Sequence, residues 1–249
     1  MATTLLVALA SSLVMLSGGA RASEPVLAVL YVANHSGEAR YDVLHKGLAD
    51  MLVTDLRAQG LTVVERARLQ ALIDEQALQA SSFIDPATAV RVGQGLGATH
   101  VVTGSLAAIA PQIRLDVRLV DVATGEVVVT ASARGAPAGF FELEQELVAR
   151  FVEAFDKRFV ALPTSQTRVG DADALLDFAA GLDLADRGEL ERARERLDRA
   201  VSRAPAFGLA RLRRDALVKQ LVQAQERRVA QVADDRAALT ETARRAVAE

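Results

Sequence analysis

The sequence predicts an α/β domain followed by a small all-α tail, and three observations lead to this prediction. Short apolar runs typical of strands alternate with helical patterns from residue 26 to residue 104. A strand pair with one polar and one apolar face follows at residues 112–134. From residue 174 onward the pattern is helical only, with small and large residues at regular spacing.

Composition limits the classes of protein to which the chain can belong. Its 249 residues suffice for one medium domain and a small one. Apolar residues make up 51% of the chain but aromatic residues only 4%, so the core must be mainly aliphatic. The formal net charge is −3 with both signs interspersed, which disfavours nucleic acid as a partner. Cysteine is absent, which excludes disulfides, thiolate zinc sites and a cysteine nucleophile.

The first 22 residues are typical of a secretory signal peptide. An apolar stretch at residues 5–16 is broken by Ser17-Gly18-Gly19, and the cleavage pattern Ala20-Arg21-Ala22 follows. The stretch is too short to span a bilayer, and a buried helix of the mature domain is the less favoured alternative. No Lys or Arg precedes it, which is unusual for such a segment. We expect cleavage after Ala22 and export of the mature protein.

The elements of the α/β domain can be placed in chain order. We expect strands at 26–32, 61–64 and 99–106, helices at 41–59, 66–78, 86–97 and 140–160, and a hairpin at 113–133. Asp85 and Pro86 form the clearest boundary, an N-cap followed by proline at the first helical position, and Gly97 ends the same helix. Thr124-Gly125 is the expected hairpin turn. Aromatic residues at helical spacing in residues 140–159 indicate core packing.

The tail is predicted to be a separate helical unit. A polar, turn-rich segment around residues 162–170 is interpreted as a linker. The expected divisions are a signal peptide at 1–22, an α/β domain at 23–161, the linker at 162–170, and the tail at 171–249. Small, large and helix-ending residues of the tail match a tetratricopeptide repeat, namely Gly181, Leu184, Gly188, Ala193, Leu197, Ala200 and Pro205.

A single repeat cannot bury its apolar face without a neighbour. We therefore expect residues 209–247 to form a helix that folds back on the repeat as a cap. The alternative is a long coiled coil, because Val222, Val229, Val232 and Leu239 fit a heptad seam. Gln225 interrupts that seam, which favours the capping helix.

No motif of the chain predicts catalytic chemistry. The glycines of Gly93-Gln-Gly-Leu-Gly97 end a helix instead of opening one, so we interpret them as packing and capping positions, not a nucleotide loop. The histidines, His35, His45 and His100, lack the spacing of a metal site. A ligand or enzyme site near Asn34-His35 is the alternative, because this loop follows the first strand, although turn chemistry explains it equally well. We expect no enzyme activity, no metal and no cofactor.

Several short motifs occur in a recognisable order between Val26 and Phe159. They are Gly47-Leu-Ala-Asp-Met-Leu52, Val63-Val-Glu-Arg66, Val102-Thr-Gly-Ser105 and the hairpin segment 114–126. Together they resemble the CsgG/FlgO-like periplasmic proteins of Gram-negative bacteria and, more distantly, the TolB-like amino-terminal domains. The resemblance implies a mixed sheet with flanking helices, a location in the periplasm or at the inner surface of the outer membrane, and no catalytic residue.

Two departures from this resemblance bear on the membrane. The chain has no cysteine that could carry a lipid, so we expect no lipid anchor. The segment from Gly104 to Gln145 is too short for two membrane-spanning hairpins, and its strand at 113–119 carries Arg and Asp on one face. We therefore expect no membrane span and no pore, although peripheral association with the outer membrane is compatible with the sequence.

The sequence leaves two non-enzymatic functions open. The first is a periplasmic or outer-membrane-associated assembly or scaffold protein, related to curli-secretion or flagellar accessory proteins. Its α/β domain would form homo-oligomers or dock at the membrane, and its tail would bind a protein partner. The second is a periplasmic regulatory module that binds and modulates a cell-envelope enzyme through the α/β face. The residues expected to contact a partner are Phe178, Leu184, Leu197, Arg211 and Arg214.

Overall fold

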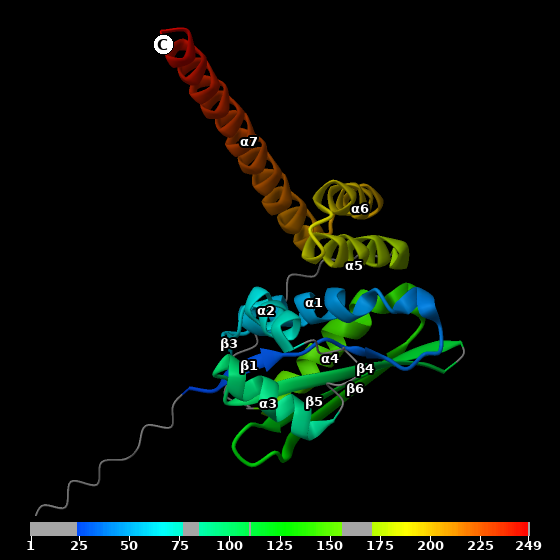
Figure 1. Cartoon of the computed structure of the whole chain (residues 1–249). Helices are drawn as coiled ribbons and strands as arrows, with labels where there is room; N and C mark the ends of the chain where they lie inside the picture. The colour runs from blue at the N-terminus through cyan, green and yellow to red at the C-terminus, as the bar shows by residue number, and fades with distance from the viewer. Residues whose placement is uncertain (1–23, 77–84, 110, 156–170, 249) are drawn as a thin grey trace, which may run out of the picture.

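The computed structural model describes residues 24–76, 85–109, 111–155 and 171–248. Its α/β part is built on one mixed sheet of order β3-β1-β4-β5-β6, in which β2 also pairs with β4 (Figure 1). The strands are β1 Val26–Val29, β2 Ala33–Asn34, β3 Thr62–Val63, β4 His100–Ile109, β5 Gln112–Asp121 and β6 Val127–Gly135. Strands β3, β1 and β4 are parallel, whereas β4, β5 and β6 are antiparallel. The predicted α/β fold with a mixed sheet is confirmed.

Helices flank the sheet and form the whole of the tail. The α/β part contains the 3-10 turns η1 Ala39–Tyr41 and η3 Pro137–Gly139 and the helices α1 Leu44–Ala58, α2 Arg66–Gln76, α3 Pro86–Leu96 and α4 Phe140–Phe155. The tail consists of α5 Ala172–Asp186, α6 Leu190–Arg203 and α7 Gly208–Ala248. The predicted bounds of α3 are confirmed, because Asp85 accepts a hydrogen bond from the Thr88 N–H and Gly97 takes a left-handed conformation with φ of 68°.

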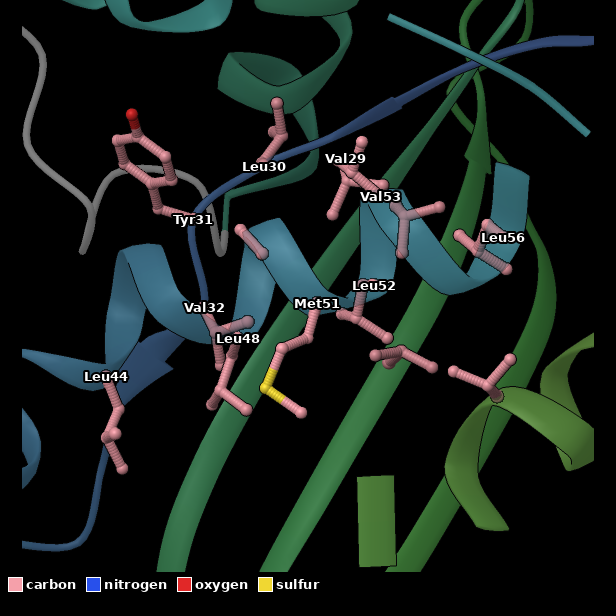
Figure 2. Packing of buried hydrophobic residues seen from close by; sticks show 14 of the residues in the cluster. Val29, Leu30, Tyr31, Val32, Leu44, Leu48, Met51, Leu52, Val53 and Leu56 are labelled. Carbon is pink, nitrogen blue, oxygen red and sulfur yellow. The ribbon is translucent and has the colours of Figure 1, made fainter. Parts of the chain in front are cut away.

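The main core lies between the sheet and the pair α1 and α4. Leu115 and Val117 of β5 are buried against Leu48 and Leu52 of α1. Figure 2 shows the apolar side chains of α1 lying over the strands. The polar residues of β5 point to the opposite face, because side chains alternate along a strand.

Helix α3 packs on that opposite face through a glycine. A Cβ atom at Gly93 would lie 2.7 Å from Val101 Cγ1 and 2.8 Å from Val122 Cγ2. This distance is shorter than a carbon–carbon contact allows, so only glycine permits the approach. The interpretation of Gly93 as a packing position is confirmed.

The first strand and first helix are shorter than expected. Strand β1 ends at Val29, because the Val32 N–H turns away and donates to the His45 carbonyl. Helix α1 begins at Leu44, since residues 39–41 form a 3-10 turn instead. The expected signal peptide at 1–22, the linker at 162–170 and the predicted ends of the helices at 66–78 and 140–160 fall outside the described residues.

The tail packs directly on the α/β part. Helices α5 and α6 form a pair in close contact, because a Cβ atom at Gly181 would lie only 2.8 Å from Leu197 Cγ. Phe207, between α6 and α7, contacts Phe141 of α4 and Phe178 of α5 with ring centroids 4.9 and 4.8 Å apart. The division into domains and the identification of the helix pair as a tetratricopeptide repeat stay predictions.

Helix α7 projects away from the rest of the molecule (Figure 1). Ala210 and Leu217 near its beginning are buried, but every side chain from Val222 to Thr240 is exposed. The expected fold-back of this helix is therefore confirmed only for its beginning and is wrong for the remainder. Charged residues crowd the later part of the helix, so burying it against the small helix pair would desolvate many of them.

Candidate protein-interaction site

The residues predicted to bind a partner do not form one surface. Phe178 and Leu197 are buried, with 0% and 1% exposure, and pack inside the protein's own core. Leu184 is half-buried, Arg211 is exposed, and Arg214 pairs with its neighbour Asp215 at 2.7 Å. In this conformation Phe178 and Leu197 stabilise the tail, and a direct role of the five residues in partner binding stays a prediction.

A stripe of exposed apolar side chains runs along the projecting part of α7. It consists of Val218, Val222, Val229, Val232 and Leu239, with exposures of 37 to 71%, and is called the α7 stripe below. Gln225 and Arg236 occupy the remaining positions of the same heptad seam. The sequence revealed this seam, but only the structure shows that no described residue covers it.

Buried charges join the tail to the α/β part. Asp50 of α1 has no exposed surface and accepts hydrogen bonds from Arg213 of α7, at 2.8 Å from Nε and 2.6 Å from Nη2. Arg66 of α2 donates to both carboxylate oxygens of Asp186 in α5, at 2.7 and 3.1 Å. Lys46 of α1 also contacts Asp186, at 3.0 Å. We call these five residues the junction cluster.

The charges of the junction cluster hold one another ionised. Burial opposes the charge of Arg66, but the hydrogen bond and charge of Asp186 outweigh it and raise the pKa of Arg66. Burial likewise opposes the charge of Asp186, but Arg66 and Lys46 keep its pKa below the ordinary value. Because Arg66 and Asp186 both remain charged at neutral pH, their ion pair stabilises the packing of the tail on the α/β part.

The sequence analysis did not predict the ion pairs of the junction cluster. Its partners lie up to 163 residues apart, so no local pattern links them. One signal was present in the sequence. Lys46 and Asp50 lie one helical turn apart beside Gly47, which marks a second packed face on α1 in addition to its leucine face.

The loop at Asn34 and His35 is closed by its own side chains. The Asn34 amide donates to Asp42 Oδ1 at 2.6 Å and to the Glu38 carbonyl at 3.0 Å, while its carbonyl oxygen accepts from the Ser36 N–H at 2.9 Å. Gly37 takes a left-handed conformation with φ of 74°. Turn chemistry therefore accounts for these residues. Within the described ranges, no three His, Asp or Glu side chains are grouped to hold a metal ion.

A second exposed surface lies on the sheet, on the face that α3 shares. Arg118 of β5 lies opposite Thr130 of β6, and Arg114 lies opposite Arg134. Asp116 neutralises Arg114 at 2.6 Å, whereas Arg118 and Arg134 point to solvent. We call this surface, with its exposed Arg118 and Arg134, the arginine face.

Comparisons with known proteins agree with the predicted resemblance. The family model described as "Curli production assembly/transport component CsgG" matches residues 15–110. No curated protein matches the chain. None of the helices in the described part of the chain is both long enough and apolar enough to span a membrane.

Three solved structures are similar to part of this chain. The LpoB C-terminal domain from Salmonella enterica is 21% identical, with 45% of this chain and 82% of that chain covered and a TM-score of 0.39. Lipoprotein GNA1162 from Neisseria meningitidis is 17% identical, with 53% and 97% covered and a TM-score of 0.41. The PelC dodecamer from Paraburkholderia phytofirmans is 16% identical, with 53% and 87% covered and a TM-score of 0.34. By this family match, residues 15–110 of the chain are similar to CsgG.

Proposed function

We propose that this protein is a non-enzymatic assembly or scaffold protein of the cell envelope, whose terminal helix binds a protein partner. The similarity to CsgG supports a protein of the envelope. The α7 stripe is the observation that carries the partner-binding role, because a helix with large apolar side chains along one seam is stabilised by burying them. We further propose that residues 1–22 are removed, that the protein is located in the periplasm, and that it acts in curli-related secretion.

The spacing of the α7 stripe defines the kind of partner. Heptad spacing fits a second amphipathic helix, which would insert its own apolar side chains between those of α7. Gln225 and Arg236 interrupt the seam at polar positions, and polar residues at such positions specify register at some cost in stability. The expected partner is therefore a helix with a matching heptad seam, from a second copy of this chain or from another envelope protein.

The test places charge within the α7 stripe. The double variant Val229→Lys and Val232→Lys should lose the partner while remaining folded, since both positions are exposed. The matched control is Ala230→Lys with Ala237→Lys, which adds the same charge to α7 away from the stripe. Sedimentation velocity of the mature protein and affinity capture from envelope extracts are the measurements. Equal association by both double variants would refute the proposal.

A regulatory module that acts on an envelope enzyme is the second candidate, and the arginine face favours it. Arg118 and Arg134 are exposed on neighbouring strands without a carboxylate paired to either in the described structure. Changing both to glutamate should abolish the stimulation of such an enzyme, while the α7 double variant should leave it intact. The reverse pattern supports the scaffold proposal.

A further inference from the structure

A pocket of about 290 Å³ lies where α1, α4 and the beginning of α7 meet. Its walls are mostly apolar and are formed by Met51, Phe141, Phe207, Leu209 and Leu212. The carboxyl groups of Asp55 and Glu144 also line it. Pockets that hold small ligands are typically apolar with a few placed polar groups, and this one is at the small end of their size range.

Glu144 is the unusual member of the pocket. It is 1% exposed, and no N–H or O–H group of the described residues donates to either of its carboxylate oxygens. A buried carboxylate without a donor is costly, because it loses its hydration and gains nothing in return. Asp55 lines the same pocket, and its carboxyl group could share a hydrogen bond with Glu144 only if one of the two carried a proton.

The protonation of this pair follows from its surroundings. Burial raises the pKa of Glu144 well above its ordinary value, and the negative charge of Asp55 raises it further. Burial also raises the pKa of Asp55. Asp55 and Glu144 therefore share a proton at the wall of a mostly apolar pocket. A bound cation at this position could replace that proton and leave both carboxylates ionised.

Most cations of the helices packed around the pocket have other partners, and Arg211 of α7 is exposed without an ion pair among the described residues. Arg213 of α7 binds Asp50, the other acid of α1 near this junction. Arg114 of β5 binds Asp116, and Arg150 of α4 binds Glu146. None of the described Lys, Arg or His side chains forms an ion pair with Glu144 or Asp55.

We propose that this pocket binds a small organic cation, a primary ammonium carried on an aliphatic chain. The ammonium would lie between Asp55 and Glu144, where it displaces the shared proton and supplies the missing donors. The aliphatic chain would lie against Phe141 and Leu212. Because Phe207, Leu209 and Leu212 belong to the tail, the ligand would also strengthen the contact between α7 and the α/β part.

The test compares ligands of one size and different charge. The full-length mature protein is titrated with n-hexylammonium, 1-hexanol and hexanoate, followed by isothermal titration calorimetry and by amide chemical shifts. We expect the ammonium to bind at least about tenfold more tightly than the alcohol, as a charged hydrogen bond of about 1.5 kcal/mol implies. Hexanoate should not bind. Equal affinities for ammonium and alcohol, or no binding of the ammonium, would overturn the proposal.

A matched pair of variants tests the role of the buried acid. Glu144→Gln keeps the shape of the side chain and should lower the affinity for hexylammonium to that for hexanol. Glu153→Gln changes an exposed residue of the same helix and should leave both affinities unchanged. In the wild type, hexylammonium should bind more tightly as the pH rises from 5 to 8, since the shared proton must leave. Unchanged affinity in Glu144→Gln, with a native amide spectrum, would overturn the proposal.

Discussion

Asp50 is the residue that ties the tail most firmly to the α/β part. It is fully buried, accepts two hydrogen bonds from Arg213, and lies 3.6 Å from Arg66. A carboxylate in this position is stabilised only by its cations, and they in turn depend on it.

We therefore expect Asp50→Ala to lower the free energy of unfolding by about 3 kcal/mol, near the lower end of the range for buried ion pairs. The lower end applies because the Arg213 side chain is 35% exposed, so its guanidinium can be hydrated by solvent once Asp50 is removed. Urea unfolding at pH 7 measures the change. Asp215→Ala, which removes the exposed partner of Arg214, should cost less than about 1 kcal/mol. Similar losses in both variants would contradict the structural role of Asp50.

Glu144 should make the protein less stable as the pH rises. Its raised pKa means that the folded state binds a proton that the unfolded state has released above the ordinary pKa of 4.5. Stability is therefore complete below that pH and is lost as the pH rises through the folded-state pKa. Each unit by which the pKa is raised corresponds to about 1.4 kcal/mol.

Urea unfolding between pH 5 and pH 8 tests this expectation. Burial lowers the pKa of His45, which makes stability rise with pH in part of this range, so the wild type is compared with Glu144→Gln at each pH. The variant should gain stability relative to the wild type as the pH rises and be the more stable protein at pH 8. Asp186 does not mask the effect, because its pKa is lowered and its contribution is lost only below about pH 4. A slope in the variant equal to that of the wild type would assign the titration to another group.

At the scale of elements, the crossing of α1 and α5 depends on Gly47. A Cβ atom there would lie 2.7 Å from Ala179 Cβ and 3.3 Å from Ala179 Cα, which is backbone and cannot move aside. Gly47→Ala should thus force the two helices apart and destabilise the protein by about 1–3 kcal/mol, despite the better helix propensity of alanine.

Gly95→Ala is the matched control within α3. Its Cβ would meet the flexible end of Leu72 at 3.1 Å, which can turn away. The gain in helix propensity of about 1 kcal/mol should then leave this variant as stable as the wild type or more so. Thermal unfolding of both variants decides whether the close approach of α1 and α5 holds in solution.

At the scale of the whole molecule, the protein has a compact part and a projecting helix. Among the side chains of α7 described up to Thr240, Leu217 is the last buried one, and all those from Val222 onward are exposed. A chain ending after Leu221 should have a free energy of unfolding within about 0.5 kcal/mol of the full chain, as for surface changes in general. The same truncation should abolish partner binding. A large loss of stability would show that residues 222–249 pack on the molecule in solution.

Local signals in the sequence predicted individual elements well. Asp85, Pro86 and Gly97 set the ends of α3, because capping and a left-handed turn depend on a few neighbouring residues. The alternation in β5 indicated its buried face, since a strand repeats every two residues. The heptad seam on α7 was equally visible. The order of the motifs also indicated the similarity to CsgG that the family model finds at residues 15–110.

Only the tertiary structure decided where the tail would lie and which of its residues would remain exposed. Leu197 has the same hydrophobic character as Leu239, yet the first is buried and the second is 71% exposed. Likewise Asp50 and Arg213 are 163 positions apart in the sequence and become partners only through the tertiary fold. Local periodicity records the conformation of a segment, whereas burial and ion pairing depend on which segments come together in space.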